Sequence, residues 1–110
     1  MGSNAKLNNF LSLPAYVTIT AQSFTKDGQY VAIANDQGKI ALYKTLNILE
    51  KTNSLHFQFD AGNCLDPNAT SRGCVNALTS LDETLIVAIS RPVNSEAAIV
   101  AFKWKDLIQG

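Results

Sequence analysis

The side chains able to do chemistry are few in this 110-residue chain, and their spacing matches no catalytic or metal-binding motif. The sequence holds one histidine, His56, and two cysteines, Cys64 and Cys74. A structural zinc site takes four Cys or His ligands in closely spaced pairs, and a nucleophilic site takes a Ser or Cys beside a general base. We therefore predict no catalytic residue, no metal ligand and no cofactor-binding residue, and we expect the protein not to be an enzyme.

Three short segments have both a chemical and a structural interpretation. His56 alternates with apolar residues in an expected strand, so we predict a solvent-facing or packing role for it. Lys103-Trp104-Lys105 could present a ring between two cations to single-stranded nucleic acid. The interpretation we favour is strand alternation, with Trp104 packed beneath a neighbouring segment and the lysines at the rim. Asp27-Gly28 is expected to form a hairpin turn and not a phosphate-binding loop, because no helix opens after it.

The composition indicates a globular protein without a strong electrostatic preference. Nine basic and nine acidic residues give a net charge of zero, so no long-range field favours nucleic acid or an anionic membrane. Charged residues make up 16%, against roughly 25% in average soluble proteins, which suggests that part of the surface is covered in the working molecule. No apolar run approaches the roughly 20 residues that span a bilayer, and no signal-peptide pattern opens the chain. We expect a soluble intracellular protein with free thiols.

Alternation of apolar and polar residues in the first sixty positions predicts a meander of four short strands. Val17, Ile19 and Ala21 alternate with threonine and glutamine, as in a half-buried strand. Asp27-Gly28 and Asp36-Gln37-Gly38 supply tight turns, in which glycine adopts positive φ without steric cost. The predicted elements are a helix over 5–13, strands over 16–24, 30–34 and 39–43, a connector with helical character over 46–53, and a strand over 55–60.

The same pattern returns in weaker form after a polar loop over 61–73. It predicts strands over 74–80, 84–90 and 97–104, separated by a turn at 81–83 and a loop over 91–95. Four matched pairs indicate an internal repeat: Asp27 with Asp82 and Tyr30 with Leu85 at a spacing of 55, and Ile40 with Ile99 and Tyr43 with Phe102 at a spacing of 59.

The first unit resembles a blade of the WD-repeat family. This resemblance implies an all-β fold made of about two four-stranded antiparallel WD-like propeller blades, an incomplete propeller, with a short N-terminal helix. Residues 1–110 would then form one partial WD40-like β-propeller, with blade one at about 16–60 and blade two at about 74–107. The residues that carry the match are Ser23-Phe24, Asp27-Gly28, Tyr30 to Ala34, Gly38, Ile40, Leu42 and Tyr43.

Both units depart from the family pattern at the positions that give it its name. Tyr43-Lys44 and Phe102-Lys103 stand where the family has Trp-Asp. The Gly-His pair expected ahead of the first strand is missing, and Ser71-Arg72-Gly73 occupies its place in the second unit. The hydrogen-bonded Asp-His-Ser-Trp network of strong WD repeats is therefore not expected, and we interpret the units as divergent blades.

Within this family the chain resembles the N-terminal part of the WD-repeat subunit of THO complexes, over Thr18 to Leu42 and Gly73 to Leu107. The resemblance implies a non-enzymatic scaffold subunit of a THO/TREX-like complex, located in the nucleus. It would act in mRNA processing and nuclear mRNA export through protein–protein contacts. The implied partners are other subunits of such a complex, with direct RNA binding weak or indirect and no membrane contact.

Two further expectations follow from the length of the chain. A propeller has about four to eight blades, so 110 residues supply only about two and cannot close a ring. We therefore expect self-association through unpaired blade faces, or further blades in a longer parent protein. The alternative function that we retain is the substrate-receptor propeller of a cullin-type ubiquitin ligase, which would bind an adaptor through its N-terminal helix and rim.

Overall fold

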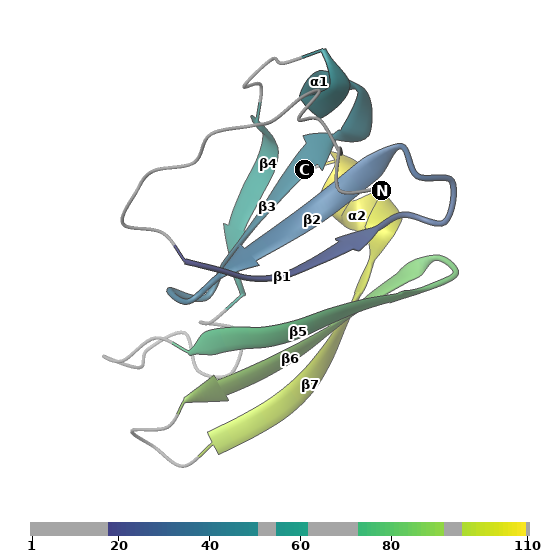
Figure 1. The fold of residues 1–110 in the computed structure, drawn as a ribbon. Helices are drawn as coiled ribbons and strands as arrows, with labels where there is room; N and C mark the ends of the chain where they lie inside the picture. The colour runs from purple at the N-terminus through teal and green to yellow at the C-terminus, as the bar shows by residue number, and fades with distance from the viewer. Residues whose placement is uncertain (1–17, 51–54, 62–72, 92–95, 110) are drawn as a thin grey trace, which may run out of the picture.

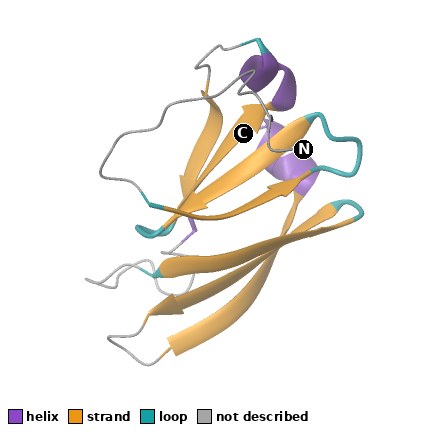
Figure 2. Ribbon diagram, in the orientation of Figure 1, coloured by secondary structure: helices purple, strands orange, loops and turns teal. Residues whose placement is uncertain are grey.

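The computed structural model describes residues 18–50, 55–61, 73–91 and 96–109, which form two antiparallel β-sheets (Figure 1). Strands make up most of the described chain, with two short helices beside them (Figure 2). The predicted all-β character is thus confirmed. The helix expected over 5–13, most of the loop expected over 61–73 and Cys64 lie outside the described residues.

The first sheet is the four-stranded meander that the sequence predicts. Its strands lie in chain order, and the connector after the third strand contains one short helix. The elements are β1 (Ile19–Phe24), β2 (Tyr30–Asn35), β3 (Lys39–Lys44), α1 (Thr45–Leu49) and β4 (Leu55–Asp60).

Two glycine turns join the first three strands, as predicted. Gly28 has φ +75° and Gly38 has φ +82°, a backbone conformation that residues with a Cβ rarely adopt. Side-chain oxygens satisfy the turn amides: the Asp27 carboxylate accepts from the Gln29 N–H at 3.0 Å, and the Asn35 amide oxygen accepts from the Lys39 N–H at 3.1 Å. The meander is therefore specified locally, by turn residues that suit these hairpins.

The second sheet has three described strands where the blade interpretation predicted four. Its elements are β5 (Cys74–Leu81), β6 (Thr84–Arg91), β7 (Glu96–Lys103) and α2 (Trp104–Gln109). Trp104 was predicted to end the last strand, but it begins α2. Its backbone N–H donates to the Glu83 carbonyl at 2.9 Å and so turns the chain away from the sheet. Neither helix of the described part of the chain has the length and hydropathy needed to cross a membrane.

The two sheets pack face to face around one shared core. β1 and β5 run side by side in the same direction, and the Ser80 hydroxyl lies 2.6 Å from both the Ser23 hydroxyl and the Phe24 carbonyl (Figure 1). Buried apolar side chains from both sheets meet between them. They are Ala32, Ala34, Ile40 and Leu42 of the first sheet, Val75, Leu78, Leu85, Val87 and Ile89 of the second, and Trp104 and Leu107 of α2.

The strand registers show that the first three strands of the first sheet and the three strands of the second follow one pairing pattern. In each sheet the first strand has an irregularity at one residue, Thr20 in β1 and Asn76 in β5. Beyond it, Phe24 pairs with Val31 as Ser80 pairs with Leu85. The backbone N–H that begins each helix also bonds the carbonyl of the first turn: Thr45 bonds Gln29 at 2.9 Å, as Trp104 bonds Glu83.

This register corrects one of the two spacings inferred from the sequence. Tyr30 pairs with Lys44, and Thr84 pairs with Lys103, so Tyr30 corresponds to Thr84 and not to Leu85. The spacing between β2 and β6 is therefore 54 residues, whereas the spacing of 59 between β3 and β7 is confirmed. The reason is the first hairpin, which is tighter in the second sheet, where only Asp82 and Glu83 separate the paired ends of β5 and β6.

The correspondence between the two sheets shows which face of each sheet is buried and which is exposed. Ile40 in the first sheet and Ile99 in the second are equivalent, but Ile40 is fully buried and Ile99 is 77% exposed. The two sheets are stacked in the same orientation. The face that carries Ile40 in the first sheet therefore lies against the second sheet, whereas the equivalent face of the second sheet, which carries Ile99, points away from the first. We call the corresponding face of the second sheet, which points away from the first, the outer face.

Replacing these two isoleucines tests the assignment. Ile40→Ala is expected to lower the free energy of unfolding by about 2–5 kcal/mol, because it opens a cavity in the shared core. Ile99→Ala makes the same chemical change at the equivalent exposed position, and in dilute protein it is expected to cost less than about 1 kcal/mol. Urea unfolding of both variants measures the difference, and equal losses would contradict the assigned faces.

Candidate protein-interaction surfaces

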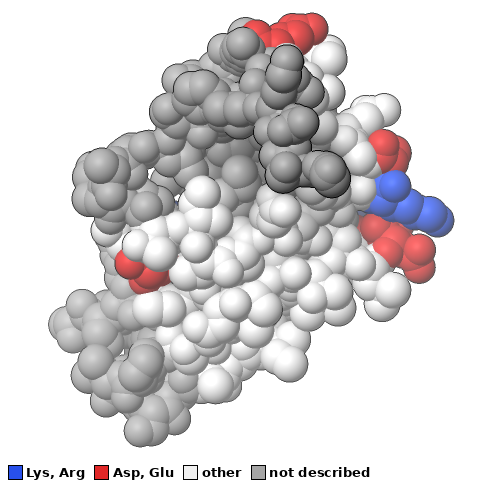
Figure 3. Space-filling view, viewed as in Figure 1, with Lys and Arg blue, Asp and Glu red and all other residues white. Residues whose placement is uncertain are grey.

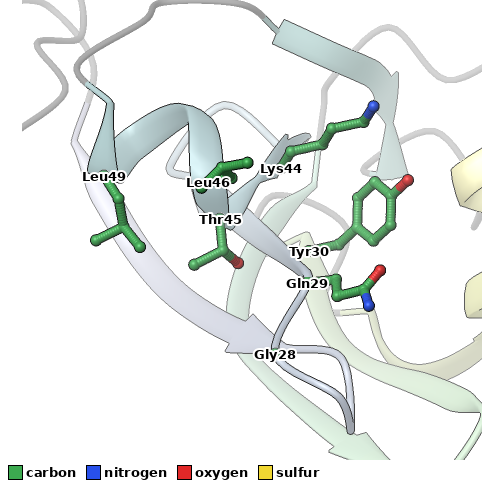
Figure 4. A pocket seen from close by; sticks show the side chains of 7 residues that line it. All are labelled: Gly28, Gln29, Tyr30, Lys44, Thr45, Leu46 and Leu49. Carbon is green, nitrogen blue, oxygen red and sulfur yellow. The ribbon is translucent and has the colours of Figure 1, made fainter.

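The first candidate surface is a groove between α1 and the turn that joins β1 to β2 (Figure 4). It has a volume of about 390 Å³. The backbone N–H of Thr45 donates to the Gln29 carbonyl. This hydrogen bond fixes the start of α1 against the turn, and so fixes the two walls of the groove relative to each other. Leu46 and Leu49 of α1 are 60% and 57% exposed and form its apolar wall. Opposite them lie Gly28, Gln29, Tyr30 and Lys44.

A second groove of about 480 Å³ lies between the sheets at the same end of the molecule. One wall is the tight turn of the second sheet with the start of α2, and the other is the first turn of the first sheet. Tyr30 lines both grooves and separates them. The other residues lining the second groove are Thr25, Lys26, Asp27, Asp82, Glu83, Trp104, Lys105 and Ile108.

The two grooves share part of their lining through the repeated unit. In each, the first hairpin turn and the helix after the third strand contribute, so Gln29 corresponds to Glu83 and Leu49 to Ile108, but the second groove is also lined by Thr25, Lys26, Asp27 and Tyr30 of the first unit. The lining differs: an apolar Leu46 in the first groove is replaced by Lys105 in the second. The first groove therefore suits an apolar side chain of a partner, and the second suits a polar one.

Both kinds of charge meet at the end where the turns lie. In Figure 3 the blue atoms stand at this end, flanked by red ones; other red atoms lie at the top and left edges, and the middle of the face is uncharged. The Lys26 ammonium lies 3.6 Å from the Asp82 carboxylate and bridges the two sheets, but both side chains are more than 70% exposed. Exposed pairs of this kind contribute little to stability, about 0–1 kcal/mol. The pair therefore shapes the rim of the second groove more than it holds the sheets together.

Hydrogen bonds lower the pKa of Asp27 below its ordinary value. The larger cause is the backbone N–H of Gln29, and the second is the Thr25 hydroxyl, which donates to the same carboxylate oxygen at 2.8 Å. Donors to a carboxylate favour its charged form. Asp27 therefore stays ionised at the rim of the second groove under ordinary conditions.

The sequence predicted a solvent-facing or packing role for His56, and the structure shows both, because the residue is exposed and also contacts two neighbours. Its ring lies 5.1 Å from the Tyr30 ring, and Nε2 lies 2.6 Å from the Ile108 carbonyl oxygen. A carbonyl only accepts, so Nε2 carries the proton and donates this bond. His56 thus ties β4 to the end of α2, behind the ring that separates the two grooves.

Trp104 is packed as the favoured interpretation predicted. The residue is 3% exposed, while Lys103 and Lys105 are exposed on either side of it. A buried indole offers no face on which a base could stack. Its Nε1–H has no acceptor within the described residues, a polar group that the apolar surroundings leave unsatisfied.

The other residues singled out in the sequence are placed apart from the grooves. Cys74 is a half-buried free thiol whose Sγ donates to the Asp36 carbonyl at 3.1 Å, where β5 meets the second turn of the first sheet. Tyr43 is 7% exposed, and its burial raises the pKa of the phenol. Phe102 holds the equivalent position in the second sheet.

The outer face of the second sheet is the third candidate surface. Adjacent strands place Ala77, Ala88 and Ile99 in one row, and Thr79, Ile86 and Ala101 in the next. Ala77, Thr79, Ile99 and Ala101 are exposed, and Ile86 and Ala88 are half-buried. An apolar sheet face of this kind is normally covered.

From the sequence we expected contacts through unpaired blade faces but assigned them to no particular residues, although two signals for these surfaces are present. Leu46 and Leu49 are three residues apart, which is the spacing of one helical face. The preceding strand β3 packs Ile40 and Leu42 into the shared core, and the two leucines are not part of that core. Ile99 alternates with Ala97 and Ala101, which marks them as one face of a strand but does not say which face is covered. Burial decides between the faces, and it depends on the packing of distant segments.

Comparison with known proteins identifies no relative. No protein-family model matches the chain, and neither do the curated proteins or the solved structures. Within the described residues, no three or more His, Cys, Asp or Glu side chains are grouped so that they could hold a metal ion.

The pKa of Asp27 tests the geometry of the turn. Thr25→Val removes the weaker of the two donors, so the pKa should rise toward the ordinary value of about 3.9 and stay below it, because the Gln29 N–H remains. The carboxyl carbon chemical shift of Asp27, followed across pH, measures its pKa in the native protein and in the variant. Because the folded-state pKa is depressed, the stabilisation by Asp27 is present above the unfolded-state pKa and is lost as pH falls through the folded one. An unchanged pKa in the variant would contradict the bond.

Proposed function

We propose that this protein is a non-enzymatic scaffold built from divergent WD-like propeller blades. One observation carries the proposal: the two sheets are successive copies of a unit, and the second exposes at Ile99 the face that the first buries at Ile40. Units that bury their apolar faces only against neighbours are typical of repeat architectures. Such architectures act mainly as binding platforms.

Three features support the blade interpretation. Each unit is an antiparallel meander, and the first strands of the two units lie side by side and run in the same direction (Figure 1). The contacts between the sheets are densest between these first strands, as expected when blades radiate from a common axis. The hairpin turns and helices of both units lie at one end, where they form the two grooves.

We further propose that the scaffold acts in a THO/TREX-like complex, in mRNA processing and nuclear mRNA export. This rests on the sequence resemblance to the N-terminal part of THO complex subunit 6. The partners would be other subunits of that complex, the location the nucleus, and RNA contact weak or indirect. The zero net charge and the buried indole of Trp104 both favour protein contacts over nucleic-acid contacts.

Affinity capture tests this function. The tagged full chain, incubated with nuclear extract, is expected to enrich THO subunits, measured by quantitative mass spectrometry against the tag alone. Enrichment of a cullin adaptor without THO subunits would favour the ubiquitin-ligase alternative and overturn the proposal, and so would a profile equal to that of the tag alone.

A paired variant asks whether the first groove is the contact. Leu46→Glu with Leu49→Glu changes two side chains that are more than half exposed, so the fold should persist. Capture of THO subunits is expected to fall at least about tenfold, the equivalent of about 1.4 kcal/mol. Leu81→Glu is the control, because Leu81 is 62% exposed and lines neither groove. Equal loss in both proteins would exclude the groove as the specific contact.

A further inference from the structure

We propose that the free edge of β7 is a strand-docking site. It takes an extended segment of a partner protein as a fourth strand, antiparallel to β7 and with large apolar residues at alternate positions. The inference rests on the strand pairing that the two sheets share and not on the identity of any nuclear partner. Its test uses purified protein and a synthetic peptide, so its failure is separate from failure of the THO-like function.

β7 ends the second sheet, whereas the equivalent strand of the first sheet has a neighbour on both sides (Figure 1). β3 pairs with β2 along one edge and with β4 along the other. Among the described strands, β6 alone pairs with β7. The described residues after β7 do not take the place of β4, because they form α2 and bury Trp104 and Leu107 in the shared core. Alternate N–H and C=O groups of β7 therefore face away from the sheet without a strand to bond.

β7 also lacks the features by which sheet edges resist pairing. The other three edge strands of the described sheets, β1, β4 and β5, each have one irregular position, at Thr20, His56 and Asn76. β7 pairs with β6 at eight consecutive positions without an irregularity. Its residues 97–102 include no charged residue, proline or glycine. Irregular pairing, charges and prolines protect natural edges, so β7 is the edge of this fold that suits an added strand.

The first unit shows which kind of strand fits this edge. β4 runs antiparallel to β3 and pairs Phe59 with Ile40 and Phe57 with Leu42. Both phenylalanines are partly buried and pack against the shared core. The neighbour of β3 is therefore recognised through its backbone and through two aromatic side chains at alternate positions.

The equivalent positions of β7, at the spacing of 59 residues, are Ile99 and Ala101. Opposite residues of two antiparallel strands lie on the same face of the sheet, so a docked strand would place its apolar side chains on the outer face. Ile99 is 77% exposed there, and Ala101 is exposed beside it. Large apolar residues two positions apart would cover the isoleucine and the space above the alanine.

A second copy of this chain does not supply that strand. The outer-face residues of β7 itself include no aromatic residue; they are Ala97, Ile99, Ala101 and Lys103. In a copy of β4, both phenylalanines already pack against the core of their own molecule. The occupant is therefore an unpaired segment of another protein. Strand addition of this kind takes its affinity from main-chain hydrogen bonds and its specificity from alternate side chains.

A titration followed by nuclear magnetic resonance tests the proposal, with the isotope-labelled full chain and a capped synthetic peptide of the β4 sequence, Leu55–Asp60. This peptide is the probe because it is the strand that the first unit uses. Its binding is expected to saturate between roughly micromolar and millimolar peptide, with the largest amide shift changes along β7. The proposal is overturned by an absence of saturable binding, or by changes centred on another strand, including β3 through exchange with β4.

Two N-methylated peptides separate strand pairing from apolar contact alone. One carries N-methyl groups at Phe57 and Phe59, and the other carries them at Gln58 and Asp60. Alternate N–H groups of a strand point to the same neighbour, so only one of the two peptides loses hydrogen bonds to β7. That peptide should bind at least about tenfold more weakly, and the other should bind like the parent. Equal affinities of the two methylated peptides would rule out strand addition.

A protein variant tests the side-chain contact. Ile99→Lys should weaken peptide binding roughly two- to fivefold, the effect of one cross-strand pair. Leu46→Lys is the matched control, because Leu46 is 60% exposed and lies on α1, so the affinity should be unchanged. Equal affinities of the two variants would contradict the contact. Sedimentation of the native chain without peptide is expected to show no dimer that Ile99→Lys disperses; such a dimer would make a second copy the occupant and overturn the proposal.

Discussion

The rest of the structure depends on the packing of the second sheet against the Ala21, Ala34 and Ile40 row of the first. Each sheet is a single layer, and a layer of three or four strands buries its apolar face only against another layer. Val75, Leu85 and Ile89 of the second sheet belong to the same buried cluster as Ala34 and Ile40 of this row. One shared core thus replaces two cores that the chain is too short to build.

The repeated unit keeps its framework and varies its surface. The strand pairing, the irregularity in the first strand and the bond that starts each helix are common to both units. The hairpin turn is shorter in the second unit, and Trp104 replaces Thr45 at the start of the helix. These changes convert an apolar groove into one rimmed by Lys105, Asp82 and Glu83. Specificity can therefore diverge between units without disturbing the core that both need.

Local signals in the sequence were sufficient for the strands and turns. Gly28 and Gly38 mark hairpins because their positive φ is costly for other residues, and alternation marks the strands that they join. The irregularities at Thr20 and Asn76 have no such signal, because the irregularity arises from pairing with a distant strand. The shortened turn at Asp82 likewise hid the true spacing of 54 residues between β2 and β6.

The start of α2 and the choice of the covered sheet face depend on tertiary packing, which the sequence indicates only in part. Trp104, Leu107 and Ile108 recur at helical spacing, but the alternation of β7 runs up to Trp104 and favoured a strand. Which apolar face is covered could not be predicted, because Ile40 and Ile99 hold the same position of the repeated pattern, three residues before Tyr43 and Phe102. Only the arrangement of the sheets distinguishes them, so the candidate surfaces follow from tertiary packing and not from motifs.

Native-state hydrogen exchange tests the shared core most directly. If both sheets depend on one core, the most protected amides of β2, β3 and β6 should exchange with the same free energy of opening, equal to that of global unfolding. Exchange of β6 through a smaller opening, while β2 and β3 stay protected, would mean that the first sheet is stable without the second. That result would contradict the account of two units that fold only against each other.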